Sequence, residues 1–318
     1  MSGALLAAAA KPAFARHETF HLRFGWLRKG FIAACEDPMA FSKRNATVDL
    51  GVGKNMVNAI RYWCQAYKVI EEAPNPERPR MPHLIPTQFG RQLLNEDGWD
   101  PWLEDPASLW LLHWKLLGPS GRCLAPVWWT AFNLFAPEQF EEFQLTDLVV
   151  ELTAAAGWKS VKESSIKKDV DCLIRTFAAR RTGRQTMDDL LDCPTRQLGL
   201  IAPAVGELRS WRFVTGPKPS LPADVVAYAC LDFMADVGPS ERTISVARLA
   251  GDPGAPGRAF RLTESNLYDL LVEAAISVPA IRVAEPAGLR QLIVDGDATA
   301  LRDQIINDYY RVSQESAA

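Results

Sequence analysis

The stretch ATVDLGVGKNMVNAIRYWCQAYKVI, residues 46–70, decides the fold that this sequence predicts. Leu50-Gly51-Val52 is typical of a tight turn between two short helices. The helix after the turn has an apolar stripe at helical spacing, formed by Val52, Met56, Ile60, Trp63 and Tyr67. Its opposite stripe is polar, with Lys54, Asn58, Arg61 and Gln65, and Asn55 beside it. Such a helix suits the DNA major groove, where amide and guanidinium groups contact bases and phosphates. The alternative is an ordinary amphipathic helix with a solvated polar face.

The residues after this helix predict a two-stranded wing. Lys68-Val69-Ile70 indicates a short strand, residues 71–82 (EEAPNPERPRMP) a charged, proline-rich tip, and Leu84-Ile85 a second strand. A helix with a capped start follows at residues 86–94. Helix, turn, second helix, wing and closing helix is the order of a winged helix-turn-helix. The same fold also serves as a protein-docking module, so the order alone does not settle the function.

The whole chain predicts a mainly α protein with short β-hairpins, built from tandem winged-helix-like domains. The first domain, 1–104, is the N-terminal winged helix-turn-helix, preceded by a helix over about 22–34. The second, 105–215, joins a Trp-rich helical pair to a second basic helix-turn-helix over 145–177. The third, 216–318, has the order helix, helix, hairpin, helix; it is acidic, so we expect it to contact protein rather than DNA.

Charge is distributed unevenly along the 318 residues. The net charge of −3 argues against a general polyanion binder. Residues 1–70 nevertheless contain ten Lys and Arg against four Asp and Glu, and residues 159–184 contain eight against three. Two basic segments in an acidic chain indicate a localised phosphate-facing surface.

Three further features limit the class of protein. The six Cys residues are scattered without metal-binding spacing, which is typical of reduced thiols in a cytoplasmic protein. The N-terminal residues 1–15 lack the basic start of a secretory signal, and we expect them to be disordered or loosely docked. No window is long and apolar enough to span a membrane.

The motif His17-Glu18-Thr19-Phe20-His21 matches the H-E-x-x-H signature of zinc proteases. The signature needs both His residues on one helical face and a third ligand downstream. A nearby proline and the lack of a Gly-and-His extension argue against it, so we predict no metal at this motif. We expect His17 and Glu18 to orient a loop against Arg23 and the following helix.

Signatures of common enzymes are missing elsewhere in the sequence. There is no P-loop, no GxGxxG and no recognised nuclease array. Asp188, Asp189 and Asp192 are close enough along the chain to bind a metal, but helix capping is the more common meaning of such a cluster. Spacing alone does not identify an enzyme.

Several segments resemble the SspB-like family of bacterial single-strand DNA phosphorothioation (Ssp) defence systems. The likeness begins with residues 17–20 (HETF), Arg23 and residues 26–29 (WLRK). It continues at residues 198–201 (LGLI), 216–222 (GPKPSLP), 256–262 (PGRAFRL) and 287–291 (AGLRQ). It therefore covers nearly the whole chain.

The resemblance implies a DNA nickase whose backbone cut allows sulfur to replace a non-bridging phosphate oxygen. The partners that it implies are double-stranded DNA, a cysteine desulfurase, an ATPase and a further Ssp protein. A divalent cation such as Mg²⁺ or Mn²⁺ stays open as a cofactor, and a homodimer as an assembly. The alternative from a different class is a non-catalytic DNA-binding regulator or scaffold, which the missing nuclease motif favours.

Phosphodiester hydrolysis needs cations around the developing charge and a base that activates water. We therefore predict Glu18, His17 and Lys29 as candidate catalytic residues. The remaining cations and amides of the basic segments are predicted to contact DNA. These are Arg23, Arg28, Lys54, Asn55, Asn58, Arg61, Lys167, Lys168, Arg180, Arg181 and Arg184.

Overall fold

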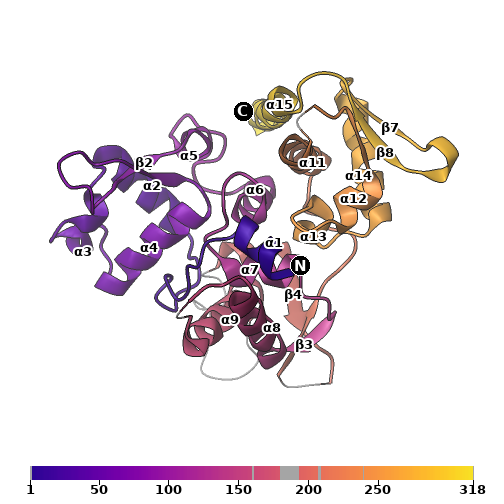
Figure 1. Cartoon of the computed structure of the whole chain (residues 1–318). Helices are drawn as coiled ribbons and strands as arrows, with labels where there is room; N and C mark the ends of the chain where they lie inside the picture. Colours follow the sequence, from indigo (N-terminus) through magenta and orange to yellow (C-terminus); the bar gives the residue numbers. More distant parts are fainter. Residues whose placement is uncertain (1, 160, 180–192, 207–208, 239, 318) are drawn as a thin grey trace.

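The computed structural model describes residues 2–159, 161–179, 193–206, 209–238 and 240–317. Helices dominate, and small antiparallel sheets join them (Figure 1). The predicted class, mainly α with short antiparallel β elements, is confirmed. The helices are α1 (Ser2–Ala9), α2 (Trp26–Glu36), α3 (Ala46–Asp49), α4 (Lys54–Ala66), α5 (Gln88–Leu94), α6 (Pro106–Leu117), α7 (Pro126–Asn133), α8 (Glu142–Ala155), α9 (Glu163–Phe177), α11 (Ala223–Val237), α12 (Val246–Gly251), α13 (Pro256–Phe260), α14 (Glu264–Ser277) and α15 (Ala298–Ala317).

The strands are short and form three separate sheets. The first sheet pairs β1 with β2, the second has the order β3-β5-β4, and the third has the order β6-β8-β7. The strands are β1 (Ile70–Ala73), β2 (His83–Pro86), β3 (Gln139–Glu141), β4 (Ile201–Pro203), β5 (Ser210–Phe213), β6 (Thr243–Ser245), β7 (Ile281–Ala284) and β8 (Gln291–Val294). The sequence predicts hairpins, whereas the second and third sheets each contain an additional strand, β3 and β6. Both are three residues long and run directly into a helix, so they show no alternating pattern.

The elements from α2 to α5 follow the order that residues 22–94 predict. Ile60, Trp63 and Tyr67 are fully buried, and Val52 and Met56 are half-buried, so the apolar stripe of α4 faces the core. The first helix begins at Trp26 rather than Leu22, after Gly25 in a left-handed conformation (φ 75°). The Thr87 hydroxyl accepts a hydrogen bond from the Gly90 amide and caps α5, as predicted.

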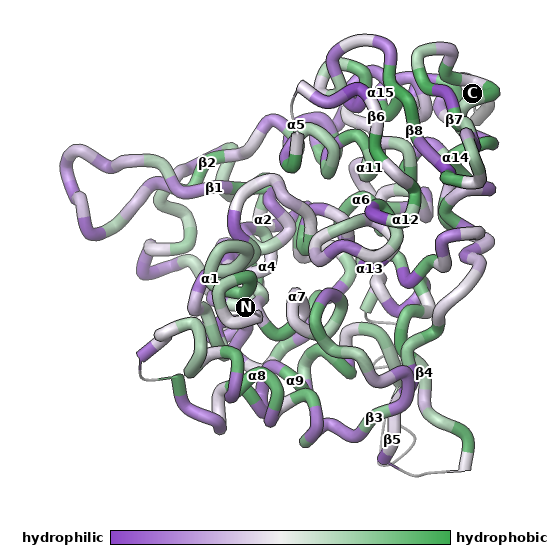
Figure 2. The backbone as a smooth tube through the Cα atoms, turned by 45° about the vertical axis from the view of Figure 1, so that its right-hand side comes forward, coloured by the Kyte–Doolittle hydropathy of each residue, from purple (hydrophilic) through white to green (hydrophobic). Residues whose placement is uncertain are grey.

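The β1–β2 hairpin ends in a projecting loop, residues 74–82, which Figure 2 shows as a largely hydrophilic tip. Asn75 fixes the shape of this loop from inside. Its amide donates to the Met81 carbonyl at 3.0 Å, and its oxygen accepts from the Glu77 and Arg78 amides at 3.1 and 3.0 Å. The hydrophilic composition of residues 74–82 therefore does not imply a loose tip, because the buried Asn75 side chain organises the turn.

The expectation of a loosely docked N-terminus is wrong. Residues 2–9 form helix α1, which packs against α8, and Leu6 is fully buried. Gly3 allows the close approach, since a Cβ there would lie 2.6 Å from the Ala155 Cβ. Beyond the helix, Ala10 pairs with Cys123 in a short parallel bridge. A run of small residues suits this tight helix contact, although its composition resembles an unstructured leader.

Helices α6 and α7 lie at the centre of the molecule (Figure 1). Every residue from Ala107 to Leu117 in α6 is buried. The side chains of Trp110, Trp114 and Trp128 are fully buried, so the Trp-rich pair forms core, as the sequence predicts. None of the helices among the described residues is both long and apolar enough to cross a bilayer.

Helices α8 and α9 correspond to the second predicted helix pair. The apolar stripe of α9 is buried over its whole length, from Ile166 through Val170 to Phe177. Helix α8 begins at Glu142, three residues before the predicted pattern over 145–177, because Glu141 and Gln144 form a capping box.

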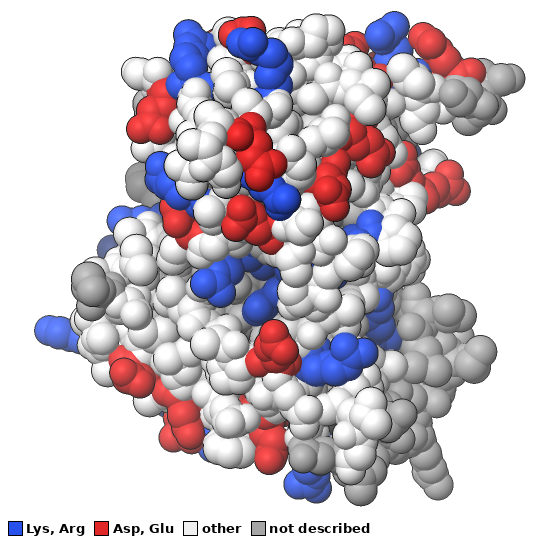
Figure 3. Space-filling model, turned by 90° about the vertical axis from the view of Figure 1, so that its right-hand side faces the viewer, with Lys and Arg blue, Asp and Glu red and all other residues white. Residues whose placement is uncertain are grey.

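The last helix, α15, packs along α11 and also reaches back to the segment after α5. The Tyr310 ring stacks on Trp99 with centroids 5.1 Å apart, and its hydroxyl lies 2.8 Å from the Ser108 hydroxyl. The Gln314 amide donates to the Gly98 carbonyl at 3.1 Å. Residues 216–318 contain nine Lys and Arg against fourteen Asp and Glu. Figure 3 shows acidic side chains gathered on the upper part of one face, with basic side chains in a hollow below.

Candidate functional site

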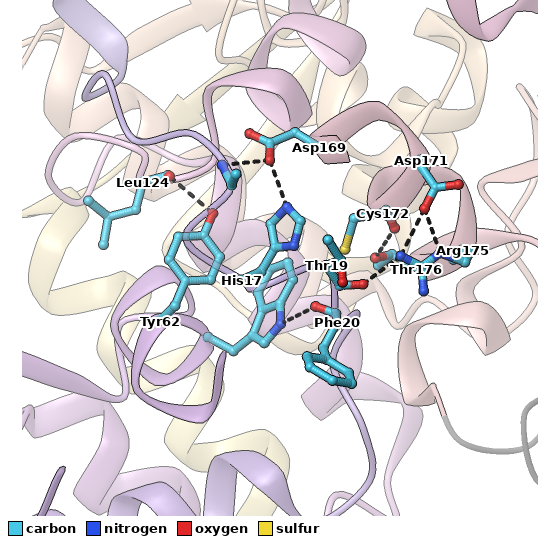
Figure 4. Close-up of polar contacts among 12 residues, drawn as sticks. His17, Thr19, Phe20, Tyr62, Leu124, Asp169, Asp171, Cys172, Arg175 and Thr176 are labelled. Atoms are coloured by element: carbon cyan, nitrogen blue, oxygen red, sulfur yellow. Dashed lines mark hydrogen bonds and ion pairs between the residues drawn. The ribbon is translucent and has the colours of Figure 1, made fainter. Parts of the chain in front are cut away.

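The segment that contains His17 and Glu18 is pinned against α9 (Figure 4). His17 Nε2 lies 2.7 Å from Asp169 Oδ1, and the same oxygen accepts a hydrogen bond from the Ala15 amide at 2.8 Å. Burial raises the pKa of the Asp169 carboxyl, while its hydrogen bond to His17 opposes the shift. The His17 side chain is inaccessible to solvent (0% exposed). Three aromatic rings surround it, each with a centroid 5.9 Å away: Tyr62, Trp63 and Trp128.

The backbone around Glu18 adopts an unusual conformation. Glu18 and Thr19 have positive φ angles of 51° and 68°, a region that non-glycine residues rarely occupy. The carbonyl of Thr19 accepts from Arg175 Nη2 at 2.5 Å, and the carbonyl of Phe20 accepts from Trp63 Nε1 at 3.0 Å (Figure 4). Each left-handed residue costs about 1–3 kcal/mol, and such residues concentrate at functional sites. The surrounding contacts thus hold Glu18 in a defined position.

The same segment lacks the geometry of a zinc protease. Residues 16–19 form turns, so His17 and His21 do not share a helical face. His17 is already engaged by Asp169. In the described ranges, the His, Cys, Asp and Glu side chains nowhere form a group of three that could hold a metal ion.

Glu18 lies on the wall of a large cleft. The cleft has a volume of about 960 Å³ and is bordered by residues 11–18, α4, the β1–β2 sheet, α5, the loop after α6, and α15. Glu18 Oε1 accepts a hydrogen bond from Asn58 Nδ2 at 3.2 Å, which connects this wall to α4. Three residues from the polar stripe of α4 therefore face the cleft together with the candidate catalytic carboxylate: Asn58, Arg61 and Gln65.

The polar face of α4 changes its surroundings along the helix. Lys54 and Asn55 are exposed at its start, whereas Arg61 is half-buried. Arg61 Nη2 lies 3.4 Å from Glu72 Oε1 on β1, and the Gln65 amide donates to the same oxygen at 3.1 Å. The first turn of α4 is thus open to solvent, and its later turns border the cleft.

Two lysines, Lys68 and Lys115, line the interior of the cleft. Lys68 Nζ donates to the Gly118 carbonyl at 3.2 Å. Lys115 Nζ lies 5.1 Å from the ring centroids of both Phe89 and Tyr228, and only 7% of the residue is exposed. Burial lowers the pKa of both ammonium groups, and that of Lys68 falls to about 8.

The cleft is basic in an acidic protein. Seven Lys and Arg residues line it against four Asp and Glu residues. Two of the cations are paired within the cleft, Arg61 with Glu72 and Arg302 with Asp303. The unpaired excess is therefore positive, which is the condition for attracting a phosphate-bearing ligand.

The predicted site residues Lys29 and Arg28 on α2, and Arg23 just before it, lie outside the cleft lining. Lys29 Nζ donates to the Leu50 carbonyl at 2.9 Å. Arg28 donates to the Leu94 carbonyl at 3.1 Å, and its guanidinium lies 4.2 Å from the Trp102 ring centroid. Arg23 lies near the rings of Phe20 and Trp26. These contacts tie α2 to its neighbours.

The predicted cations of the second basic segment are partly described. Lys167 and Lys168 are exposed on α9, and Lys167 Nζ lies 2.6 Å from Glu163 Oε1. Arg180, Arg181 and Arg184 lie outside the described residues, as do Asp188, Asp189 and Asp192. Between Glu163 and Phe177, the second basic segment therefore contributes no residue to the cleft lining.

Sequence reasoning missed six cations of the cleft, because they come from separate parts of the chain: Lys11, Arg16, Lys68, Lys115, Arg122 and Arg302. One signal was available. Residues 109–117 (LWLLHWKLL) form an apolar helix with a single lysine, and a buried lysine is rare without a role. No sequence pattern indicated that Lys68 lies close to it in space.

Comparisons with known proteins identify the family. The sequence model of the family described as "Protein of unknown function (DUF4007)" matches residues 14–310. A structure described as "SspB crystal structure" shares 41% identity with this chain, with a TM-score of 0.91 over 96% of this chain and 90% of that one. A "Magnesium ion-bound SspB crystal structure" shares 42% identity with the same TM-score and coverage. Among curated proteins, no match is found. The chain belongs to the DUF4007 family and is an SspB-like protein.

Proposed function

We propose that this chain is a DNA-binding component of a DNA phosphorothioation system, and that it nicks DNA so that sulfur can enter the backbone. The observation that carries the proposal is the similarity to SspB structures over nearly the full length of both chains. The sequence resemblance to the Ssp defence systems supplies the expected activity and the expected partners, a cysteine desulfurase and an ATPase. The basic cleft in an acidic protein is consistent with a DNA substrate.

We interpret the elements α2 to α5 as a winged helix-turn-helix and keep the division at residues 1–104, 105–215 and 216–318. In this arrangement α4 is the recognition helix and the projecting β1–β2 loop is the wing. Lys54 and Asn55 at the exposed start of α4 are the residues best placed to contact a duplex. Asn58 and Arg61 then connect the duplex surface to the cleft.

For the chemistry, the geometry favours Glu18 over His17 and Lys29. Glu18 lies on the cleft wall, where Arg16 and Arg61 also lie, so a carboxylate base and cations share one space. His17 is sealed in the core, so it acts on the reaction by holding the backbone of Glu18 through Asp169. Lys29 is a positioning residue for the α3–α4 turn, because it binds the Leu50 carbonyl.

The relative that is described with bound Mg²⁺ raises the question of a metal here. Mg²⁺ in proteins is often held by one or two carboxylates together with water and phosphate oxygens. Across the described ranges, no group of three suitable side chains is assembled. We assign no step of the reaction to a metal, and the nicking assay compares the protein with and without Mg²⁺.

A non-catalytic DNA-binding scaffold is the second candidate function. The burial of His17 favours it, because that ring cannot reach a substrate in this conformation. The bond from Asn58 to Glu18 also occupies part of the carboxylate that the nickase proposal needs as a base.

A nicking assay separates the two candidates. Purified protein is incubated with supercoiled plasmid, with and without Mg²⁺ or Mn²⁺, and open-circular product is measured. We expect nicking by the wild type and at least a tenfold loss in Glu18→Gln with DNA binding retained. Glu163→Gln is the matched control, since Glu163 is an exposed carboxylate on α9 outside the cleft. No nicking by wild type under any metal condition, alone or with its partner proteins, leaves the scaffold as the function.

A further inference from the structure

The interior of the cleft holds two lysines that make few polar contacts with the described residues. Lys68 has one hydrogen-bond partner, the Gly118 carbonyl. Lys115 lies between two aromatic rings. Within the described parts of the chain, neither ammonium group has a carboxylate within 4 Å. Burying an unpaired charge costs free energy, so these lysines reduce the stability of the empty protein.

The carboxylate that acts most strongly on the Lys115 charge, Asp232, is already engaged by other side chains. Asp232 accepts from Arg302 Nη1 at 2.5 Å through one oxygen. Its other oxygen accepts from Trp114 Nε1 at 2.8 Å and from the Ser120 hydroxyl at 3.2 Å. Burial lowers the pKa of Lys68 most strongly, and the positive charge of Lys115 lowers it further, as expected for two like charges that line the same cleft. An anion between them would relieve this repulsion.

The lining of the cleft indicates which anion fits. Aromatic rings border it together with the cations: Tyr62, Phe89, Trp99 and Tyr228. Rings beside cations are the combination that binds unpaired nucleotides, because bases stack on the rings while phosphates contact the cations. A volume of about 960 Å³ is at the upper end for a small-ligand pocket, which leaves room for a nucleotide but not for a double helix.

We propose that the interior of the cleft binds a single unpaired nucleotide, with Lys68 and Lys115 holding its phosphate. The nucleotide is either free or a unit of a DNA strand drawn out of the duplex. This inference rests on the proposed action on DNA, and it adds that the substrate reaches the cleft as a single strand. Glu18 and Arg61 at the cleft wall then lie along the path of that strand.

Binding and stability together test the proposal. A fluorescent single-stranded oligonucleotide, the duplex of the same sequence and dAMP are titrated into wild type and into the Lys68→Met, Lys115→Met double variant. Methionine keeps the unbranched chain and adds no strain at Lys68, whose φ is 59°. Arg282→Met, Arg311→Met is the matched control, because it removes two exposed cations that lie outside the cleft and outside the predicted DNA contacts.

We expect the double variant to bind the oligonucleotide at least tenfold more weakly, with a Tm equal to or above that of wild type. Binding of the single-stranded oligonucleotide but not of dAMP identifies the ligand as a unit of a DNA strand. Binding of dAMP alone identifies the ligand as a free nucleotide. If the double variant binds the single-stranded oligonucleotide and dAMP with wild-type affinity, the proposal is overturned. A lower Tm also overturns it, since it would show that the lysines support the fold.

The nicking assay keeps this inference separate from the proposed function. Nucleotide binding that needs both lysines, in a protein that never nicks plasmid, removes only the nickase. Unchanged nicking by the double variant, with unchanged oligonucleotide binding, removes only the nucleotide site.

Discussion

Replacement of Asp169 by Asn tests whether the buried contact with His17 holds the N-terminal segment in place. The carboxylate oxygen that accepts from both His17 and the Ala15 amide becomes a neutral amide oxygen at the same position. The amide nitrogen that replaces the second oxygen cannot accept at all. Two donors, the His17 ring and the Ala15 amide, therefore lose a charged acceptor, while the shape of the core stays the same.

The cost follows from these contacts. A hydrogen bond to a charged group contributes about 1.5–3 kcal/mol, and removing one member of a buried pair costs about 3–5 kcal/mol. Burial raises the pKa of the Asp169 carboxyl because it disfavours the charged form. The carboxylate therefore contributes less to the free energy of unfolding than it would without this desolvation. We therefore expect Asp169→Asn to lower the free energy of unfolding by about 2–3 kcal/mol, and Asp169→Ala by about 3–5 kcal/mol.

Urea denaturation followed by circular dichroism measures both values. Glu163→Gln on the same helix is the control, and we expect little change in stability, because its ion pair with Lys167 is exposed to solvent. A loss below about 0.5 kcal/mol in Asp169→Asn would contradict the reasoning. Additive effects of Asp169→Asn and His17→Phe in a double-mutant cycle would do the same, since contacting partners must couple.

Three further predictions concern α4, Lys68 and α1. Lys54→Ala, Asn58→Ala, Arg61→Ala should weaken duplex binding without unfolding and reduce the slope of log affinity against log salt by about two, measured by fluorescence anisotropy; an unchanged slope would place the phosphates elsewhere. The pKa of Lys68 falls from 10.5 to about 8, so the unfolded chain binds more protons between these values and stability rises with pH. Relative to Lys68→Met, wild type should gain about 2 kcal/mol in urea denaturation between pH 7.5 and 9.5, and a flat difference would refute the linkage. Gly3→Val should cost about 1–3 kcal/mol and expose the N-terminus to limited proteolysis, because its Cβ would overlap Ala155; wild-type resistance would contradict the close contact.

The parts of the fold that the sequence predicts are those encoded by local periodicity. The stripe of α4 and the cap at Thr87 each lie within a few turns of one element, and the structure contains both. Strands β3 and β6 escaped prediction because three residues are too few for an alternating pattern. Helix α1 was misjudged because its small residues gain their value only from the close approach of α8.

The candidate site was only partly predictable for the same physical reason. Glu18, Asn58 and Arg61 belong to the segments that attracted notice, and the structure brings them to one cleft. Lys115 comes from a core helix, and Lys68 follows the end of α4, so only the tertiary fold places them together. The burial of His17 could not be foreseen either, because its partner Asp169 is 152 residues away.

The position of α15 has a consequence for how this protein matures during synthesis. Arg302 and Ile306 of α15 form part of the cleft wall, while the opposite wall comes from the first 72 residues. A ribosome adds about 5–20 residues per second, and the N-terminal elements can fold long before the last helix emerges. The cleft is therefore still open on one side when most of the chain has left the ribosome. Premature termination before residue 298 would yield a protein that retains α4 and its exposed basic turn but lacks an enclosed cleft.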